Sequence, residues 1–505
     1  MPFSRPCRLA AAAIVYSLTC LSAQDSLRTS ATTLEPALSI TKHQIVLQGR
    51  PLKYTATAGS LLMKDEKGKP KATIFFVAYT KDDASDPVKR PICFTFNGGP
   101  GSSSVWLHLG AIGPKRVLMT DDGMSIPPPY KLVENEYSWL DQTDLVFIDP
   151  VETGYSRPAP GEDKKQFTGY LEDLASVGDF IRLYTTRYNR WVSPKFLAGE
   201  SYGTTRAAGL AGYLQDKYGM YFNGICLISS ILNFQTARFD VGNDLPFVLF
   251  LPTYTATAWY HKKLPSDLQQ DLHKTLNEVR RFSLDEYAPA LMHGDRLPDP
   301  QRKDIVRQLS RFTGLSADYI EQTNLRVNIA RFCKELRRDE RKTIGRLDSR
   351  FLGIDRDAAG ERTEYDPSYN TGIYGPFAGM VNDYLRRTLG YKSDLPYEIL
   401  SGDRVSPWNY SNVQNQYLNV AETLRGAMSK NRFLKVWIAN GYYDLATPFF
   451  ATEYTVNTMQ LDPSLRGNMT LTYYESGHMM YIHKVSLAKF RDDAARFIKS
   501  ALPGE

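Results

Sequence analysis

The chain has 505 residues, of which 42% are hydrophobic and 12% aromatic, so it can bury a large core and is not disordered throughout. Lys and Arg outnumber Asp and Glu by 61 to 55, and a net charge of +6 on this length predicts no nucleic-acid partner. Apolar runs stay below the roughly 18 residues of a membrane span, so the sequence predicts a soluble body without a stable membrane span.

The first residues are typical of a secretory signal peptide. Arg5 and Arg8 give a basic start, residues 9–21 form an apolar run, and small residues follow. We therefore predict a signal peptide over 1–23, a flexible tail over 24–40, and export to the periplasm or out of the cell. A buried N-terminal helix is the alternative interpretation.

Cleavage after residue 23 would leave three cysteines, Cys93, Cys226 and Cys333. The first two lie in strand-like apolar runs, where a buried, inert thiol is the usual state. One disulfide is possible, but an odd number of cysteines does not indicate a disulfide framework. The sequence has no CxxC and no HExxH motif, so we predict no metal and no cofactor.

Alternation of strand and helix patterns predicts an α/β fold. Residues 43–80 alternate apolar and polar side chains around two turn signals, as antiparallel strands do. Short runs that are apolar throughout are typical of parallel strands covered on both faces, and they occur at 92–96, 145–148, 196–198, 225–228 and 436–439. Helical patterns lie between and after them, at 171–184, 207–218 and 485–498. We expect a mostly parallel central sheet flanked by helices.

About 200 residues separate the fourth of these apolar runs from the fifth, far more than a crossover needs. Apolar residues at helical spacing recur within this interval. We therefore predict a mostly helical cap insertion over 240–400 that divides the α/β core into 41–239 and 401–505. The segment 331–350 is rich in Arg and Lys, and we interpret it as a solvated helix face.

Residues 199–203, Gly-Glu-Ser-Tyr-Gly, match the pattern G-x-S-x-G. The motif alone is weak, but a strand-like run precedes it and a helix-like run follows it. A sharp turn from strand to helix needs glycine on both sides, because a Cβ there would clash with backbone, and it lifts the serine hydroxyl above the sheet edge. We predict Ser201 as a nucleophile; an exposed serine in a glycine-rich turn is the alternative.

A serine nucleophile needs a histidine to accept its proton and a carboxylate to orient that histidine. In α/β proteins that carry the nucleophile on such a turn, the three residues follow one another along the chain in the order Ser, acid, His. His478 follows a strand-like segment and a turn, whereas His483 fits a surface position in the next helix. Asp444 lies just past the strand-like run at 436–439, and the competing Asp403 lacks such a strand. We predict Asp444 and His478 as partners of the serine.

Residues 97–104, NGGPGSSS, follow a predicted strand. Acyl transfer places negative charge on a carbonyl oxygen, and glycine lets backbone N–H groups approach that oxygen closely. The N–H groups of Gly99 and Tyr202 are the natural donors. A plain glycine-rich turn or a phosphate loop is the alternative, and the lysine expected of a phosphate loop is missing.

Together these residues resemble the serine carboxypeptidase family, whose members have the α/β-hydrolase fold. The motifs that carry the resemblance keep the family's order over residues 96–480: FNGGPGSSS (96–104), GPKR (113–116), NEYSWLDQTDLVFIDPVETGYS (135–156), GESYG (199–203), NGYYDLATP (440–448) and SGHMM (476–480). The resemblance implies that peptides lose their C-terminal residues, usually at acidic pH. It implies Ser201 as nucleophile, His478 as base, Asp444 as its orienting acid, and Gly99 with Tyr202 as oxyanion hole.

The resemblance also implies that Asn97 and Glu200 bind the substrate's terminal carboxylate. Two carboxyl groups at hydrogen-bond distance are not easily both ionised, so Glu200 must hold a proton and binding should weaken as the pH rises. The chain departs from the family where Ala111 and Ile112 replace a common acidic position and Ser102 replaces a cysteine. These departures leave the substrate preference open.

The leading hypothesis is therefore an exported serine carboxypeptidase that acts on peptides through an acyl-enzyme on Ser201. An esterase or acyltransferase that uses the same triad is the first alternative. A binding protein that kept a hydrolase scaffold is the second. The oligomeric state and the preferred C-terminal residues do not follow from the sequence.

Overall fold

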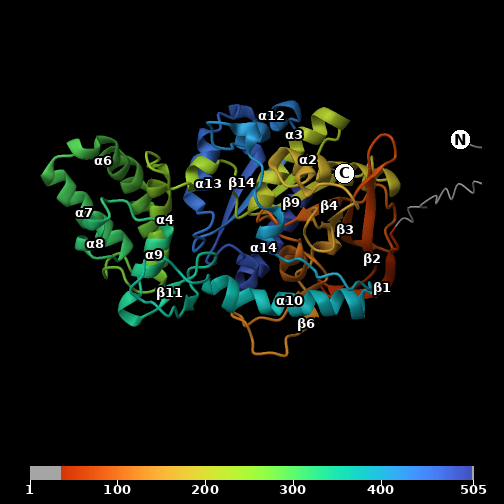
Figure 1. Ribbon diagram of the computed structural model, residues 1–505, viewed down its shortest axis with the longest axis horizontal. Helices are drawn as coiled ribbons and strands as arrows, with labels where there is room; N and C mark the ends of the chain where they lie inside the picture. Colours follow the sequence, from red (N-terminus) through yellow and green to blue (C-terminus); the bar gives the residue numbers. More distant parts are fainter. Residues whose placement is uncertain (1–35, 503–505) are drawn as a thin grey trace, which may run out of the picture. The chain divides into compact units, whose positions relative to one another are not determined.

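The computed structural model describes residues 36–502 (Figure 1). Their central feature is a sheet with the order β1-β2-β3-β7-β4-β9-β10-β13-β14, and β8 (Arg157–Pro158) pairs with β3. The N-terminal strands β1 (Ser39–Leu47), β2 (Arg50–Lys64) and β3 (Pro70–Lys81) pair in antiparallel fashion, as the alternating pattern predicts. The predicted signal peptide and residues 24–35 of the predicted tail lie outside the described residues.

The middle and far side of the sheet are parallel. Six strands pair in parallel from β7 to β14, which confirms the predicted α/β class. They are β7 (Asp144–Ile148), β4 (Ile92–Phe96), β9 (Lys195–Glu200), β10 (Gly224–Ile228), β13 (Lys435–Gly441) and β14 (Met469–Tyr474). The first five contain the continuously apolar runs of the sequence, because side chains on both faces are buried.

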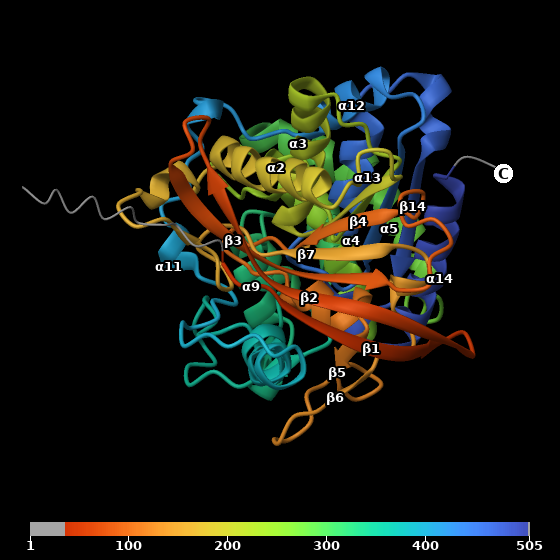
Figure 2. The ribbon, with the colours of Figure 1, turned by 90° about the vertical axis from the view of Figure 1, so that its right-hand side faces the viewer.

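Helices cover both faces of this sheet, and the period-2 alternation of the strands separates the two layers. On β4, Ile92 and Phe94 pack with α2 (Tyr170–Arg187), α3 (Tyr202–Tyr218) and α12 (Ala421–Lys430). Cys93 points to the other side, where α14 (Lys484–Ser500) and α10 (Tyr374–Asp383) contribute to the core. Figure 2 shows α2 and α3 on one side of the strands.

Short helices and strands lie in the connections between these elements. They are α1 (Val105–Leu107), β5 (Lys115–Val117), β6 (Leu132–Glu134), β11 (Thr343–Ile344), β12 (Leu352–Gly353) and α11 (Gly402–Val405).

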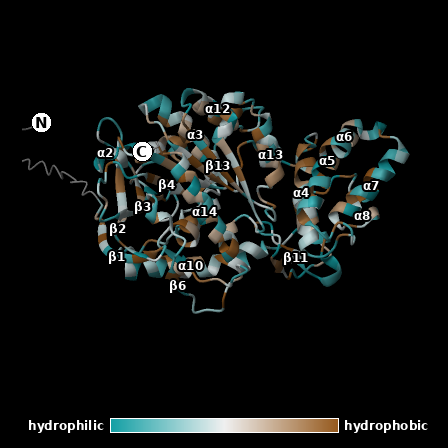
Figure 3. Cartoon of the chain, turned by 180° about the vertical axis from the view of Figure 1, so that it is seen from behind, coloured by the Kyte–Doolittle hydropathy of each residue, from teal (hydrophilic) through white to brown (hydrophobic). Residues whose placement is uncertain are grey.

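A second group of helices follows β10 and lies at the end of the structure away from β1 and β2 (Figure 1). Its members are α4 (Leu245–Tyr260), α5 (Leu272–Phe282), α6 (Ala288–His293), α7 (Asp299–Thr313), α8 (Ala317–Gln322) and α9 (Ile329–Glu335). They share an apolar cluster with Phe449 of α13 (Phe449–Thr458), so the group packs against the sheet domain through α13. In Figure 3, α7 at the outer edge is largely hydrophilic.

The interpretation of 331–350 as one solvated helix face is wrong. The helix ends at Glu335, and the Lys334 side chain is buried in an ion pair with Asp355 at 2.6 Å. Arg350 is also buried, with only 4% of its side chain exposed. The chain from 341 onward folds back onto the sheet's edge instead of continuing as a helix.

Cys93, Cys226 and Cys333 are buried free thiols. The first two lie in β4 and β10, which flank β9 in the central sheet, and none of the three forms a disulfide. In the part of the chain that the structure describes, no helix is both long enough and apolar enough to cross a membrane.

Candidate active site

Ser201 lies in the turn between β9 and α3, at the carboxyl end of a central parallel strand. Its φ of +60° is one that side-chain-bearing residues rarely adopt, as in a strained nucleophile turn. A Cβ on Gly199 would lie 2.1 Å from the carbonyl oxygen of Gly203, and one on Gly203 would lie 2.8 Å from that of Phe96. Neighbouring backbone therefore leaves no room for a Cβ at either position, which is why the G-x-S-x-G pattern has glycine there.

Asp444 and His478 come together from two loops at the same edge of the sheet. The Asp444 Oδ2 atom accepts a hydrogen bond from His478 Nδ1 at 2.8 Å, and both side chains are buried. The carboxylate also accepts from the Thr447 hydroxyl at 2.6 Å and from the N–H groups of Ala446 and Thr447 at 2.8 and 3.0 Å. These donors fix the carboxylate, which in turn orients the imidazole.

The electrostatic surroundings favour a protonated His478. Burial opposes the charged imidazolium, but the charge and hydrogen bond of Asp444, together with the charge of Glu200, outweigh it and raise the pKa of His478 above its ordinary value. Such a histidine can accept a proton from a serine hydroxyl and hold it in contact with its carboxylate.

Ser201 and His478 line the same cavity, whose volume is about 360 Å³. Asn97, Gly99 and Glu200 line it as well, so this cavity collects five of the seven predicted site residues from separate segments. Among the described residues, the Ser201 hydroxyl has no hydrogen-bond partner. The contact between Ser201 and His478 thus remains a prediction, and such contacts often tighten only when substrate binds.

The glycine-rich loop lies directly against the serine turn. A Cβ on Gly98 would be 2.4 Å from the Tyr202 nitrogen, and Gly99 has a φ of +100° that favours glycine. Arg206 donates to the Asn97 carbonyl at 2.6 Å, and Asp173 holds Arg206 through a buried ion pair at 2.7 Å. The sequence analysis did not identify this pair, because nothing in the local pattern of α2 or α3 links its two members.

Glu200 is buried beside Ser201 and is almost inaccessible to solvent. Its Oε1 atom accepts from Asn97 Nδ2 at 3.0 Å, and its Oε2 atom accepts from the Tyr481 hydroxyl. Burial raises the pKa of Glu200 to about 7, against the opposing effects of His478 and of the two donors. The group is therefore largely protonated in mildly acidic solution. Tyr481 is a site residue that the sequence analysis missed.

A segment of the helical insertion completes the wall beside Asp444 and His478. The N–H of His478 donates to the Leu347 carbonyl at 2.7 Å, and the N–H of Leu445 donates to the Arg346 carbonyl at 3.1 Å. Asp348 accepts from the N–H of Gly477 at 3.0 Å. This segment thus ties together the loops that carry the candidate acid and base.

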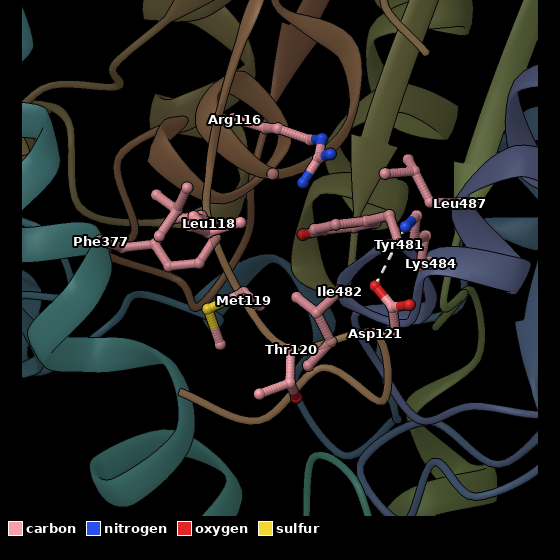
Figure 4. A pocket seen from close by; sticks show the side chains of 12 residues that line it. Arg116, Leu118, Met119, Thr120, Asp121, Phe377, Tyr481, Ile482, Lys484 and Leu487 are labelled. Atoms are coloured by element: carbon pink, nitrogen blue, oxygen red, sulfur yellow. Dashed lines mark ion pairs between the residues drawn. The ribbon is translucent and has the colours of Figure 1, made fainter. Parts of the chain in front are cut away.

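Apolar side chains cover other parts of the cavity; they include Trp106, Leu347, Tyr369, Ile373, Leu400 and Met479. Tyr481, which contacts Glu200, lines a separate cavity of about 80 Å³, beside the ion pair of Lys484 and Asp121 at 3.2 Å (Figure 4). The second cavity has room for little more than water, so the larger one fits a peptide end better.

Comparisons with a family model and with curated proteins agree on the family. A family model described as serine carboxypeptidase matches residues 50–487. The pheromone-processing carboxypeptidase KEX1 of Saccharomyces cerevisiae is 37% identical over 145 residues, which are 27% of this chain and only 19% of that relative. Serine carboxypeptidase-like 22 of Arabidopsis thaliana is 22% identical over 436 residues, covering 82% of this chain and 80% of that protein.

The structural comparison supports the fold. The crystal structure of a prohormone-processing carboxypeptidase from Saccharomyces cerevisiae has a TM-score of 0.55 and 18% identity, and the match covers 88% of this chain and 91% of that one. The expected α/β-hydrolase fold is thereby confirmed. The family match extends over both parts of the sheet and the helical insertion between them. The chain belongs to the serine carboxypeptidase family.

Proposed function

We propose that this protein is a serine carboxypeptidase that removes C-terminal residues from peptides. Ser201 attacks the last peptide carbonyl, and His478 accepts the serine proton and passes it to the leaving amine. Water then hydrolyses the acyl-enzyme. The hydrogen bond between Asp444 and His478, on the wall of the cavity that Ser201 also lines, carries the proposal.

The oxyanion hole is assigned to the N–H groups of Gly99 and Tyr202. Gly98 lies close to the Tyr202 nitrogen, so the two donors belong to adjoining backbone segments. Preorganised donors of this kind stabilise the negative oxygen of the tetrahedral intermediate. Asn97 and protonated Glu200 would bind the terminal carboxylate, since both are buried on the same wall and share a hydrogen bond of 3.0 Å.

A matched pair of substrates tests the exopeptidase activity. We expect cleavage of a blocked dipeptide with a free C-terminus and little cleavage of the same compound amidated, because only the former has the carboxylate. Equal cleavage of both would contradict the carboxypeptidase proposal. Hydrolysis of small acyl esters with none of any peptide would favour the esterase alternative, and Ser201→Ala supplies the background rate.

We further propose that the protein is exported and that residues 240–400 act as a cap that shapes side-chain preference. The basic and apolar N-terminal pattern supports export. Mass spectrometry of protein expressed in a secreting host should find a mature N-terminus at Gln24. A retained Met1 in the secreted fraction would contradict the cleavage site.

A further inference from the structure

Arg346 is the only Arg or Lys among the described residues that line the 360 Å³ cavity. Its side chain is exposed, and its guanidinium forms no ion pair and no hydrogen bond with any described residue. Most other arginines of the insertion are paired; Arg326, for example, meets Asp244 at 2.6 Å. An arginine without an ion-pair partner among the described residues thus lines the proposed active site.

The backbone around this cation is fixed although its side chain is free. The N–H of Arg346 donates to Asp366 Oδ1 at 3.0 Å, and its carbonyl accepts from the N–H of Leu445, next to Asp444. The following residue, Leu347, donates to Asp366 Oδ2 at 3.1 Å and accepts from His478. The Cα of Arg346 is therefore held between the two loops that carry the candidate acid and base.

The other charged groups of the cavity do not neutralise the guanidinium. Asp366 uses both carboxylate oxygens for the N–H groups of residues 346 and 347 and for Ser368. Glu200 has a raised pKa, and His478 is bonded to Asp444. The positive charge of Arg346 acts on the cavity wall, where it opposes protonation of His478 and so acts to lower the pKa of that histidine.

We propose that Arg346 binds a carboxylate of the peptide substrate and so determines which peptide ends are preferred. The inference rests on the proposed carboxypeptidase function. A guanidinium presents its N–H donors in a planar fork that matches a carboxylate, and a partly enclosed cavity screens the pair less than open solvent does. The carboxylate has two sources in a peptide: the C-terminus itself, or an acidic side chain near it.

The test compares Arg346→Gln with the wild-type protein on four blocked dipeptides with free C-termini: Phe-Glu, Phe-Gln, Glu-Phe and Gln-Phe. An uncharged phenyl ester serves as a fifth substrate, because it uses the same nucleophile without a carboxylate. Arg362→Gln is the matched control, since Arg362 is an exposed arginine of the same insertion that does not line the cavity. Arg346→Lys keeps the charge and should retain more activity than the glutamine variant.

We expect Arg346→Gln to lower kcat/KM, relative to the ester, by about tenfold, the usual scale for one lost charge-assisted hydrogen bond. A loss on all four peptides identifies the terminal carboxylate as the ligand. A loss confined to peptides with Glu identifies an acidic side chain, at the last position if Phe-Glu is affected and at the penultimate position if Glu-Phe is affected.

Two results would overturn the inference: unchanged kcat/KM on every peptide, or an equal loss on peptides and ester. A wild-type protein that cleaves none of the four peptides would instead refute the proposed function, and the inference with it. The exposed position of Arg346 and the use of its backbone for folding contacts keep the glutamine variant foldable, and equal thermal midpoints verify this.

Discussion

Glu200→Gln offers the sharpest test of how the proposed site recognises a peptide end. In the wild-type protein, Glu200 must carry a proton to donate to a carboxylate, and burial raises its pKa from 4.5 to about 7. Substrates with a free C-terminus should therefore bind well below pH 7 and more weakly above it. Glutamine donates through its amide at every pH, so the variant should lose this dependence, while the Tyr481 hydroxyl turns to accept from the amide.

The expected magnitude follows from the pKa. A change from 4.5 to about 7 disfavours the ionised form by about 3 kcal/mol, at about 1.4 kcal/mol per pH unit. The native state thus holds this proton more tightly than the unfolded chain does. The resulting stability is fully present below pH 4.5 and is lost as the pH rises to about 7. Relative to Glu200→Gln, the wild-type protein should lose about 3 kcal/mol of unfolding free energy over that range.

Two assays measure these effects. In the first, kcat/KM for a blocked dipeptide falls up to tenfold per pH unit above pH 7 in the wild-type protein and stays level in Glu200→Gln. At the acidic side of the pH profile, kcat/KM rises as His478 loses its proton, and the pKa of His478 lies above its ordinary value. This acidic limb remains in both proteins. In the second, urea unfolding at pH 4.5 and 8 gives the difference in stability between the two proteins.

An uncharged ester is the control substrate, since it presents no carboxylate and should show no alkaline limb near pH 7 in either protein. The same alkaline limb in wild type and variant would refute the assignment of Glu200. A stability difference that does not change with pH would refute its raised pKa.

Three further substitutions test the rest of the site. Ser201→Ala should lower kcat by about 10⁴-fold or more while leaving peptide affinity, measured by calorimetry, near that of the wild type; residual turnover within tenfold would exclude Ser201 as nucleophile. Thr447→Val removes the hydroxyl that donates to Asp444 at 2.6 Å and should lower kcat about tenfold. Thr447→Ser keeps a hydroxyl and should restore kcat. Equal rates in the two variants would contradict a role for this hydrogen bond. Gly98→Ala would place a methyl group 2.4 Å from the Tyr202 nitrogen. We expect the variant to lose activity and to lose about 2–4 kcal/mol of unfolding free energy, measured by thermal unfolding. A fully active and stable variant would show that the loop can move away.

Much of the fold follows from local sequence patterns. The runs at 92–96, 145–148 and 225–228 are apolar because their strands are covered on both faces. Among the antiparallel strands, β1 and the first half of β2 alternate because one face is more exposed, whereas the middle of β3 is buried on both faces. The serine turn was also predictable, since Gly199 and Gly203 are needed where backbone segments approach closely. These features depend on neighbours in the chain, so the sequence expresses them locally.

The parts of the site that the sequence analysis missed depend on contacts between distant segments. Tyr481 meets Glu200 across 281 positions, and Arg206 holds the carbonyl of Asn97 across 109. Neither tyrosine nor arginine stands in a pattern that distinguishes it from a surface or core residue.

The sequence by itself determined the alternation of core strands and helices, because burial dictates where apolar residues stand. It also determined the nucleophile turn and the glycine-rich loop, because backbone geometry dictates residue type at those places. Tertiary structure alone decided that the stretch after 341 leaves the helical group and returns to the loops of Asp444 and His478. It also decided that Arg346 stands on the cavity wall with a free guanidinium. A charge on a polar segment looks the same in sequence whether it faces solvent or substrate, and only the packing of distant backbone segments distinguishes the two.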